Sequence, residues 1–146
     1  MSAFNFNLQK VLNVRNIQED IAQNNFLKAK QKKKSMENEL AELNKTKKDT
    51  YEFIRKELSS SIDMTLQARR FLYLHKQKIN EQKEKIFFQE KEVAKKQQQM
   101  IEKQKKRKVL DKLKEKKYKS FYKEHLKNEQ KILDEIGQRA EIEERR

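Results

Sequence analysis

The chain has 146 residues, with a single glycine and no proline, cysteine or tryptophan. β-Sandwiches, barrels and α/β domains need tight turns, which are built mainly from glycine and proline, so this composition excludes them. Charged residues make up 41% of the chain and hydrophobic residues 34%, too few apolar side chains for a thick layered core. The composition therefore predicts an all-α protein whose helices meet along narrow apolar stripes, with intrinsic disorder as the alternative.

The first predicted helix covers residues 7–58, where apolar residues recur at alternating steps of four and three. This spacing is typical of a coiled-coil seam. The stripe consists of Leu8, Leu12, Ala22, Phe26, Ala29, Met36, Leu40, Leu43 and Ile54. Polar residues occupy other positions of the same frame, namely Arg15, Glu19, Lys33, Lys47, Thr50 and Glu57. We therefore expect a long helix with a weaker seam than that of an ideal zipper.

The serine-rich segment at residues 59–63 is the strongest turn signal in the chain. Serine and aspartate side chains compete for backbone hydrogen bonds, which favours caps and turns over helix interiors. We predict that the chain reverses there, with Met36 opposite about residue 87 and the amino terminus near Phe121. A single uninterrupted helix that dimerises in parallel is the alternative.

The second predicted helix covers residues 64–140 and is followed by a frayed carboxy-terminal tail. Its less regular stripe runs through Ile79, Ile86, Val93, Met100, Leu110, Leu113, Phe121, Ile132 and Ile136. Glutamate, lysine, glutamine and leucine are good helix formers, so the helix is favoured even where the stripe is thin. The predicted fold is one coiled-coil domain over residues 1–146, an antiparallel two-helix hairpin in the form of a rod.

Positive charge is concentrated in one segment, Lys95–Lys123, which carries 13 basic and 3 acidic residues, a net charge of +10 out of the chain's +14. Such a stripe can bind nucleic acid, anionic lipid or an acidic protein surface. Lysine outnumbers arginine 29 to 8, whereas specific recognition of bases and phosphates favours arginine. A solvated helix face without a partner is the plainer interpretation, and a structural spacer is a third.

Residues suited to catalysis are sparse. The sequence has no glycine-rich phosphate loop and no paired metal-ligand motif, and His75 and His125 are isolated. We therefore expect no enzyme activity, no cofactor, no metal and no small-molecule substrate. No apolar run is long enough to cross a membrane, and the lack of cysteine agrees with a reducing compartment, so we expect a cytoplasmic protein.

Aromatic residues are more numerous than a two-helix seam can cover. They include Phe53, Phe71, Tyr73, Phe87 and Phe88. Exposed aromatic side chains mark partner surfaces, although those around Phe71 can equally close the end of the hairpin. At the other end, Phe4, Phe6 and Leu8 are expected either to staple the terminal segment to the hairpin or to insert into a partner.

Three segments carry a resemblance to a known family. They read Phe6-x-Leu8-x-x-Val11-Leu12-x-x-Arg15-x-x-x-Glu19, then Val109-Leu110-Asp111-Lys112-Leu113-Lys114-Glu115-Lys116, then Glu129-Gln130-Lys131-x-x-Asp134-Glu135-Ile136-x-x-Arg139. Their order, the chain length and the basic character resemble FliJ, the small coiled-coil component of the flagellar type III protein export apparatus. The resemblance implies an antiparallel coiled coil similar to the central stalk of rotary ATPases.

The resemblance also implies partners. One end of the hairpin would enter the ring of the export ATPase FliI, and the outer surface would contact the export gate protein FlhA at the cytoplasmic face of the membrane. FliH and export chaperones are further expected partners, and nucleic acid is disfavoured. For the ATPase ring the matching residues are Leu8, Leu12, Arg15, Lys105, Lys106, Arg107, Lys108, Gln130, Asp134 and Arg139. For the gate they are Leu43 and Phe71.

The sequence departs from the family pattern on the gate-facing part. Thr46 and Thr50 stand where the family has tyrosines, with Tyr51 one place along. His75, Lys78 and Gln82 replace apolar or histidine positions after Phe71. Two functions of different classes follow from the sequence: a stalk-like export component that promotes the ATPase ring, and a basic coiled coil that binds nucleic acid or an anionic surface.

Overall fold

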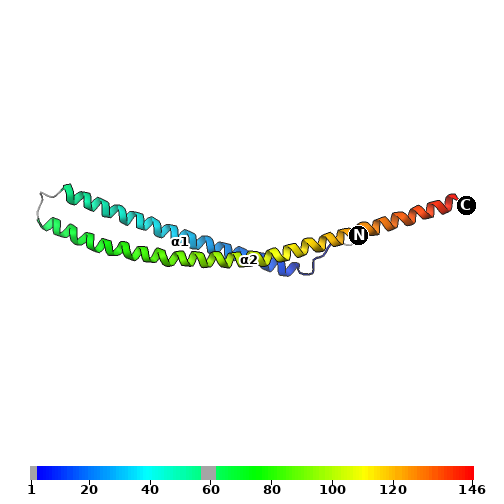
Figure 1. Cartoon of the computed structure of the whole chain (residues 1–146), viewed down its shortest axis with the longest axis horizontal. Coiled ribbons are helices and arrows are strands. Elements are labelled where there is room, and N and C mark those ends of the chain that lie inside the picture. The colour runs from blue at the N-terminus through cyan, green and yellow to red at the C-terminus, as the bar shows by residue number, and fades with distance from the viewer. Residues whose placement is uncertain (1–2, 57–61) are drawn as a thin grey trace. The chain divides into compact units, whose positions relative to one another are not determined.

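In the computed structural model, which describes residues 3–56 and 62–146, the chain forms two long helices (Figure 1). Helix α1 spans Gln9–Lys56 and α2 spans Ile62–Glu144, and no strand occurs within the described ranges. The predicted all-α helical hairpin is confirmed. The predicted turn lies outside the described residues as far as residue 61, and Ile62 and Asp63 already belong to α2.

The helix ends have simple chemical causes. At the start of α1, the Gln9 N–H donates to the Phe6 carbonyl at 3.0 Å, which gives one of the first free N–H groups a partner. Asp63 lies in the first turn of α2, where a negative charge interacts favourably with the helix dipole. Helix α2 continues four residues beyond the expected residue 140, through good helix formers such as Glu141 and Glu143.

The described residues group into two compact units, although the sequence predicts a single domain. The hairpin unit comprises Asp20–Ile101, and the terminal unit comprises Met1–Glu19 with Glu102–Arg146. Each unit pairs a segment of α1 with a segment of α2.

In the hairpin unit the two segments run antiparallel, side by side in Figure 1. Leu43 is paired with His75, Met36 with Gln82, and Ala29 with Gln89, so a step of seven back along α1 matches a step of seven forward along α2. The expectation that Met36 faces about residue 87 was wrong by roughly one helical turn. Contacts along the seam determine the register, whereas the serine-rich segment predicts only an approximate centre for the reversal.

Burial along α1 follows the predicted coiled-coil frame. Within the hairpin unit, every described frame position from Ala22 to Ile54 is buried or half-buried, including the polar Lys33, Lys47 and Thr50. On α2, Leu72 and Ile79 are buried and Ile86 and Val93 are half-buried. The apolar core of this unit is thus one narrow column of side chains between two helices.

A second column on α2 is polar and buried. His75, Gln82 and Gln89 are 6%, 6% and 8% exposed and are spaced seven residues apart. Each sends a side-chain nitrogen to a backbone carbonyl of α1, over distances of 2.7, 2.9 and 3.0 Å. A carbonyl oxygen has two lone pairs, so it can accept this bond in addition to its own helical one. We call these three residues the polar ladder.

The terminal unit is held by aromatic and apolar contacts near the start of the chain. Phe6 and Leu12 are buried, and the Phe4 ring meets Tyr118 edge-on at 5.3 Å and Phe121 at 5.5 Å between centroids. Phe4 and Phe6 therefore staple the terminal segment to α2. The expectation that the seam stripe continues to Ile132 and Ile136 was wrong. Both residues are exposed, like every other residue of α2 after His125.

Candidate partner-binding surfaces

The buried polar side chains of the described residues are paired within the protein. Across residues 3–56 and 62–146, no group of three histidine, aspartate or glutamate side chains is placed to hold a metal ion. In the same ranges, every buried side-chain nitrogen or oxygen has a hydrogen-bond partner. No described helix has the length and apolar character needed to cross a membrane. The candidate sites are the exposed surfaces of the two helices, where the residues predicted from the sequence lie.

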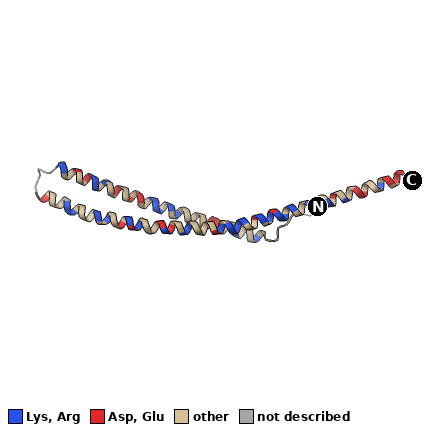
Figure 2. Cartoon of the chain, viewed as in Figure 1, with Lys and Arg blue, Asp and Glu red and all other residues tan. Residues whose placement is uncertain are grey.

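The basic run on α2 splits into exposed and engaged residues. Lys105, Lys106 and Lys108 are exposed, in the part of α2 where blue dominates in Figure 2. Arg107 is half-buried, and its guanidinium donates to the carboxylates of Glu19 on α1 and Asp111 on α2. These hydrogen bonds raise the pKa of Arg107, and the bond to Glu19 has the largest effect. Three of the four predicted residues thus face solvent, and the fourth joins the two helices.

The predicted residues on α1 also divide. Leu12 is 3% exposed and belongs to the core of the terminal unit, whereas Leu8 is 38% exposed. Arg15 is half-buried, and its guanidinium donates to the Gln18 side chain at 3.4 Å. Leu8 and Arg15 are therefore the members of this set that retain surface for a partner.

Sequence reasoning missed an exposed apolar face on the same helix. Val11, Val14 and Ile17 are 41%, 51% and 58% exposed, and successive steps of three place them near one another on α1. A shallow hollow of about 310 Å³ lies beside Val11 and Val14. The signal in the sequence is a second set of apolar residues beside the seam, more than one partner helix can cover.

The last part of α2 carries a similar face. Tyr122, Leu126, Leu133 and Ile136 are all exposed, and their steps of four, seven and three place them on one side of the helix. The predicted residues Gln130 and Asp134 are joined by a hydrogen bond of 3.1 Å, and Arg139 is exposed. This segment presents apolar and polar side chains with no α1 segment against them.

The two residues predicted for the gate meet at His75. The His75 ring nitrogen lies 2.7 Å from the Leu43 carbonyl oxygen, and the Phe71 ring stacks on the imidazole at 5.3 Å between centroids. Leu43 is half-buried in the seam, whereas Phe71 is 46% exposed. The structure thus brings both residues together, with Phe71 as the one that faces solvent.

A hollow of about 320 Å³ lies beside Phe71. Leu74, His75, Lys78 and Glu81 help to line it. Three departures from the expected family pattern follow Phe71. Two of them, His75 and Lys78, fall at this hollow, and the third, Gln82, is buried in the polar ladder. The substitutions change the wall of the surface beside Phe71 while Phe71 itself stays exposed.

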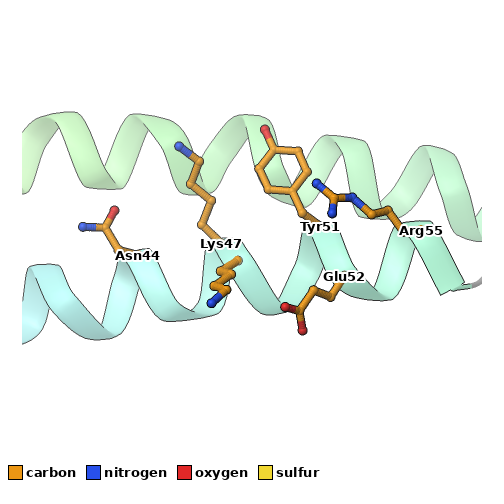
Figure 3. A pocket seen from close by; sticks show the side chains of 6 residues that line it. Asn44, Lys47, Tyr51, Glu52 and Arg55 are labelled. Atoms are coloured by element: carbon orange, nitrogen blue, oxygen red, sulfur yellow. The ribbon is translucent and has the colours of Figure 1, made fainter.

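A second hollow, of about 360 Å³, lies along the last turns of α1 (Figure 3). Figure 3 shows Lys47 and Tyr51 rising toward the facing helix, and Glu52 pointing away from it. The Lys76 ammonium lies over the Tyr51 ring, 5.7 Å from its centroid. The hydrogen bond from Lys76 to the Tyr51 hydroxyl lowers the pKa of Tyr51 below the usual value of 10.0. The positive charges of Lys76 and Lys47 act in the same direction.

The threonines that replace family tyrosines turn toward their own helix. The Thr46 hydroxyl donates to the Glu42 carbonyl at 3.0 Å, and the Thr50 hydroxyl donates to the Thr46 carbonyl at 2.8 Å. Their polar groups are satisfied locally. Tyr51 and the exposed Phe53 are thus the aromatic residues that this part of α1 offers.

Phe87 and Phe88 form an exposed aromatic pair further along α2. Their ring centroids are 5.8 Å apart, and the Lys91 ammonium lies 4.5 Å from the Phe87 centroid and 5.8 Å from that of Phe88. The two rings are 53% and 63% exposed. The prediction that the aromatics exceed what the seam covers is confirmed here, as it is at Phe71.

Comparisons with known proteins agree with this architecture. A model of the flagellar FliJ protein family matches residues 4–146. No curated protein sequence matches the chain. Among solved structures, the chain is similar to a putative YscO homologue, CT670, from Chlamydia trachomatis. The two share 21% sequence identity with a TM-score of 0.53, and the match covers 93% of this chain and 94% of the other. At this identity the structural match supports the fold alone.

Proposed function

Since the chain belongs to the flagellar FliJ family, we propose that it is a non-enzymatic component of flagellar protein export that links the export ATPase ring to the membrane export gate. The observation that carries the proposal is the family match over residues 4–146, nearly the whole chain. The helical hairpin supports it, because two long paired helices offer extended surfaces to partners.

We assign the ATPase ring FliI to the terminal unit. Its exposed apolar residues, including Val14 on α1 and Leu133 and Ile136 on α2, have no cover within the described chain and would be buried in a complex. The exposed lysines Lys105 and Lys106 add a positive potential that would steer this unit toward acidic loops of a ring.

We assign the export gate protein FlhA to the hairpin unit, at Phe71 and the hollow beside it. A half-exposed aromatic ring next to a hollow is the usual form of an interface anchor, because the ring buries a large area at a small cost in side-chain entropy. Leu43 supports this site from the seam by fixing His75, on which the Phe71 ring stacks.

The same proposal covers location and further partners. The protein would be cytoplasmic and peripheral at the flagellar base, where FliH and export chaperones are within reach of the ATPase and the gate.

The ATPase assignment is tested with the full chain and its cognate export ATPase. The protein should increase ATP hydrolysis and ring formation at low salt. Replacing both Leu133→Asp and Ile136→Asp should weaken that effect about tenfold or more, because two buried apolar anchors become charged. The control Asn128→Asp with Gln138→Asp adds the same charge to exposed positions away from the apolar face. Unchanged hydrolysis and ring formation with the unaltered protein would refute the role.

A further inference from the structure

Seven lysines of α2 share one face of the helix in the terminal unit. They are Lys105, Lys108, Lys112, Lys116, Lys119, Lys123 and Lys127, and all seven are exposed. At 3.6 residues per turn and about 1.5 Å per residue, they fall within about 100° of the helix circumference along about 33 Å of its axis. The acidic residues of this span, Asp111, Glu115 and Glu124, lie outside that sector. We call this face the lysine stripe.

The charge of the lysine stripe is hardly neutralised. Lys119 pairs with Glu115 at 3.2 Å, an exposed contact that is screened by water. The other six lysines make no ion pair among the described residues of the chain. The half-buried Arg107 and Leu110 lie on the opposite side of α2, so the stripe points away from the α1 segment of its unit. The positive charge is therefore free to act on a partner.

We propose that the lysine stripe binds the surface of an anionic lipid bilayer, with this part of α2 lying parallel to the membrane plane. A straight row of like charges meets a flat anionic surface along its whole length at once. The phosphates of a nucleic acid duplex follow a helical path, so fewer lysines of a straight row would contact a phosphate. Only Val109 and Leu126 interrupt the sector, so the binding is superficial, electrostatic and reversible.

The side-chain chemistry favours lipid over nucleic acid. The stripe contains no arginine for bidentate contacts and no aromatic ring for base stacking. Lysine supplies a point charge on a long flexible stem, which suits lipid phosphates that have no fixed arrangement. This inference goes beyond the proposed function, in which protein partners bring the chain to the membrane, and the lysines of the stripe are distinct from Leu133 and Ile136, the residues changed in the ATPase test.

The test measures sedimentation of the full chain with vesicles of phosphatidylcholine containing about one third phosphatidylglycerol, at about 50 mM salt. The stripe variant is Lys112→Gln, Lys116→Gln, Lys119→Gln and Lys123→Gln. The control variant, Lys28→Gln, Lys32→Gln, Lys34→Gln and Lys45→Gln, removes the same charge from exposed positions on α1. Glutamine is a good helix former, so circular dichroism should show both variants folded.

Each lysine near an anionic surface contributes about fivefold to binding, so the stripe variant should bind at least about a hundredfold more weakly. The control should lose much less, and arginine at the four stripe positions should restore binding. Equal binding to pure phosphatidylcholine, or an equal loss in the control, would overturn the proposal. So would tighter binding to duplex DNA than to the vesicles at the same salt. ATPase stimulation, measured on the same samples, reports separately on the proposed function.

Discussion

The hairpin unit and the terminal unit hold their helix segments together by different means. In the hairpin unit, three buried side chains of the polar ladder bond to the backbone of the facing helix at intervals of seven residues. In the terminal unit, the connection rests on apolar and aromatic packing around Phe6 and Leu12 and on the pairing of Arg107 with Glu19. Buried polar contacts at fixed positions specify a register, whereas packing and ion pairs tolerate adjustment.

This difference matches the surfaces that each unit presents. The terminal unit leaves most of its apolar and charged side chains in solvent, including Val14 and Ile136. The hairpin unit also exposes apolar side chains, such as Leu27 and Leu74, and it differs in that exposed aromatic residues such as Phe71 lie beside a seam with a fixed register. A unit with a fixed register can hold one anchor in place, and a loosely connected one can adapt to a large partner.

The largest effect is expected from the apolar column of the hairpin unit. Ile79 is 4% exposed, and Ile79→Ala should lower the free energy of unfolding by about 2–4 kcal/mol, because it removes buried methyl groups and leaves a cavity. Leu74→Ala, at an exposed position on the same helix, is the control and should change it by much less. Thermal unfolding followed by circular dichroism measures both. Equal losses would show that the column is not the core.

The polar ladder comes next. Gln82→Ala removes hydrogen bonds to the Met36 carbonyl and to the Glu39 carboxylate and should cost about 1–2 kcal/mol. Replacing all three ladder residues with leucine should keep or raise stability but allow other pairings, because the buried polar groups that specify the register are gone. Light scattering should then detect more self-association than in the unaltered chain. A leucine variant that stays identical in mass and register would show that the ladder specifies nothing.

The ladder also marks the limit of what the sequence could predict. The frame of α1 was readable because steps of four and three survive even where Lys33 or Thr50 occupies the seam. On α2, Gln82 and Gln89 looked like gaps in a stripe, since glutamine is equally common on solvated faces. Gln82 and Gln89 lie in the seam because they bond to backbone carbonyls of α1. Every residue has such a carbonyl, so the sequence does not indicate which ones will be partners.

The candidate surfaces were predictable to a similar degree. Exposed aromatics such as Phe71 and Phe88 follow from counting rings against the width of a two-helix seam. The burial of Leu12 agrees with its place in the predicted stripe of α1. The pairing of Arg107 could not be predicted, because it depends on which residue of the other helix lies opposite. A small error in the predicted register between α1 and α2 is therefore enough to assign such a residue to solvent when it lies in the seam.

A smaller effect is expected for the ion pair in the terminal unit. Glu19→Gln should cost about 0.5–1 kcal/mol, reduced further at high salt, because Glu19 and Arg107 are mostly shielded from solvent and join the two helices. Asp111→Asn should cost less, because Asp111 and Arg107 lie on the same helix and Asp111 is more exposed. Denaturant titration at two salt concentrations measures both. A larger loss in the Asp111 variant would contradict this account of the pair.

The pH dependence of this pair has a definite sign. Because the pKa of Arg107 is raised in the folded chain, the stability it contributes is fully present below the pKa of the unfolded chain and is lost only as the pH rises through the pKa of the folded chain, far into the alkaline range. Titration of Arg107 therefore makes no contribution to changes in stability across the neutral range.

The smallest effect is expected at Tyr51. Its pKa is lowered because the Lys76 ammonium donates to the hydroxyl and favours the phenolate. The stability gained is present above the unfolded pKa of 10.0 and is lost as the pH falls through the folded value, so it matters only in alkaline solution. Phenolate absorbance during a pH titration should show an early step that is absent in Tyr51→Phe, and Lys76→Gln should move that step to higher pH. If Lys76→Gln leaves the early step in place while Tyr51→Phe removes it, the cause lies with Lys47 rather than with the contact between the two helices.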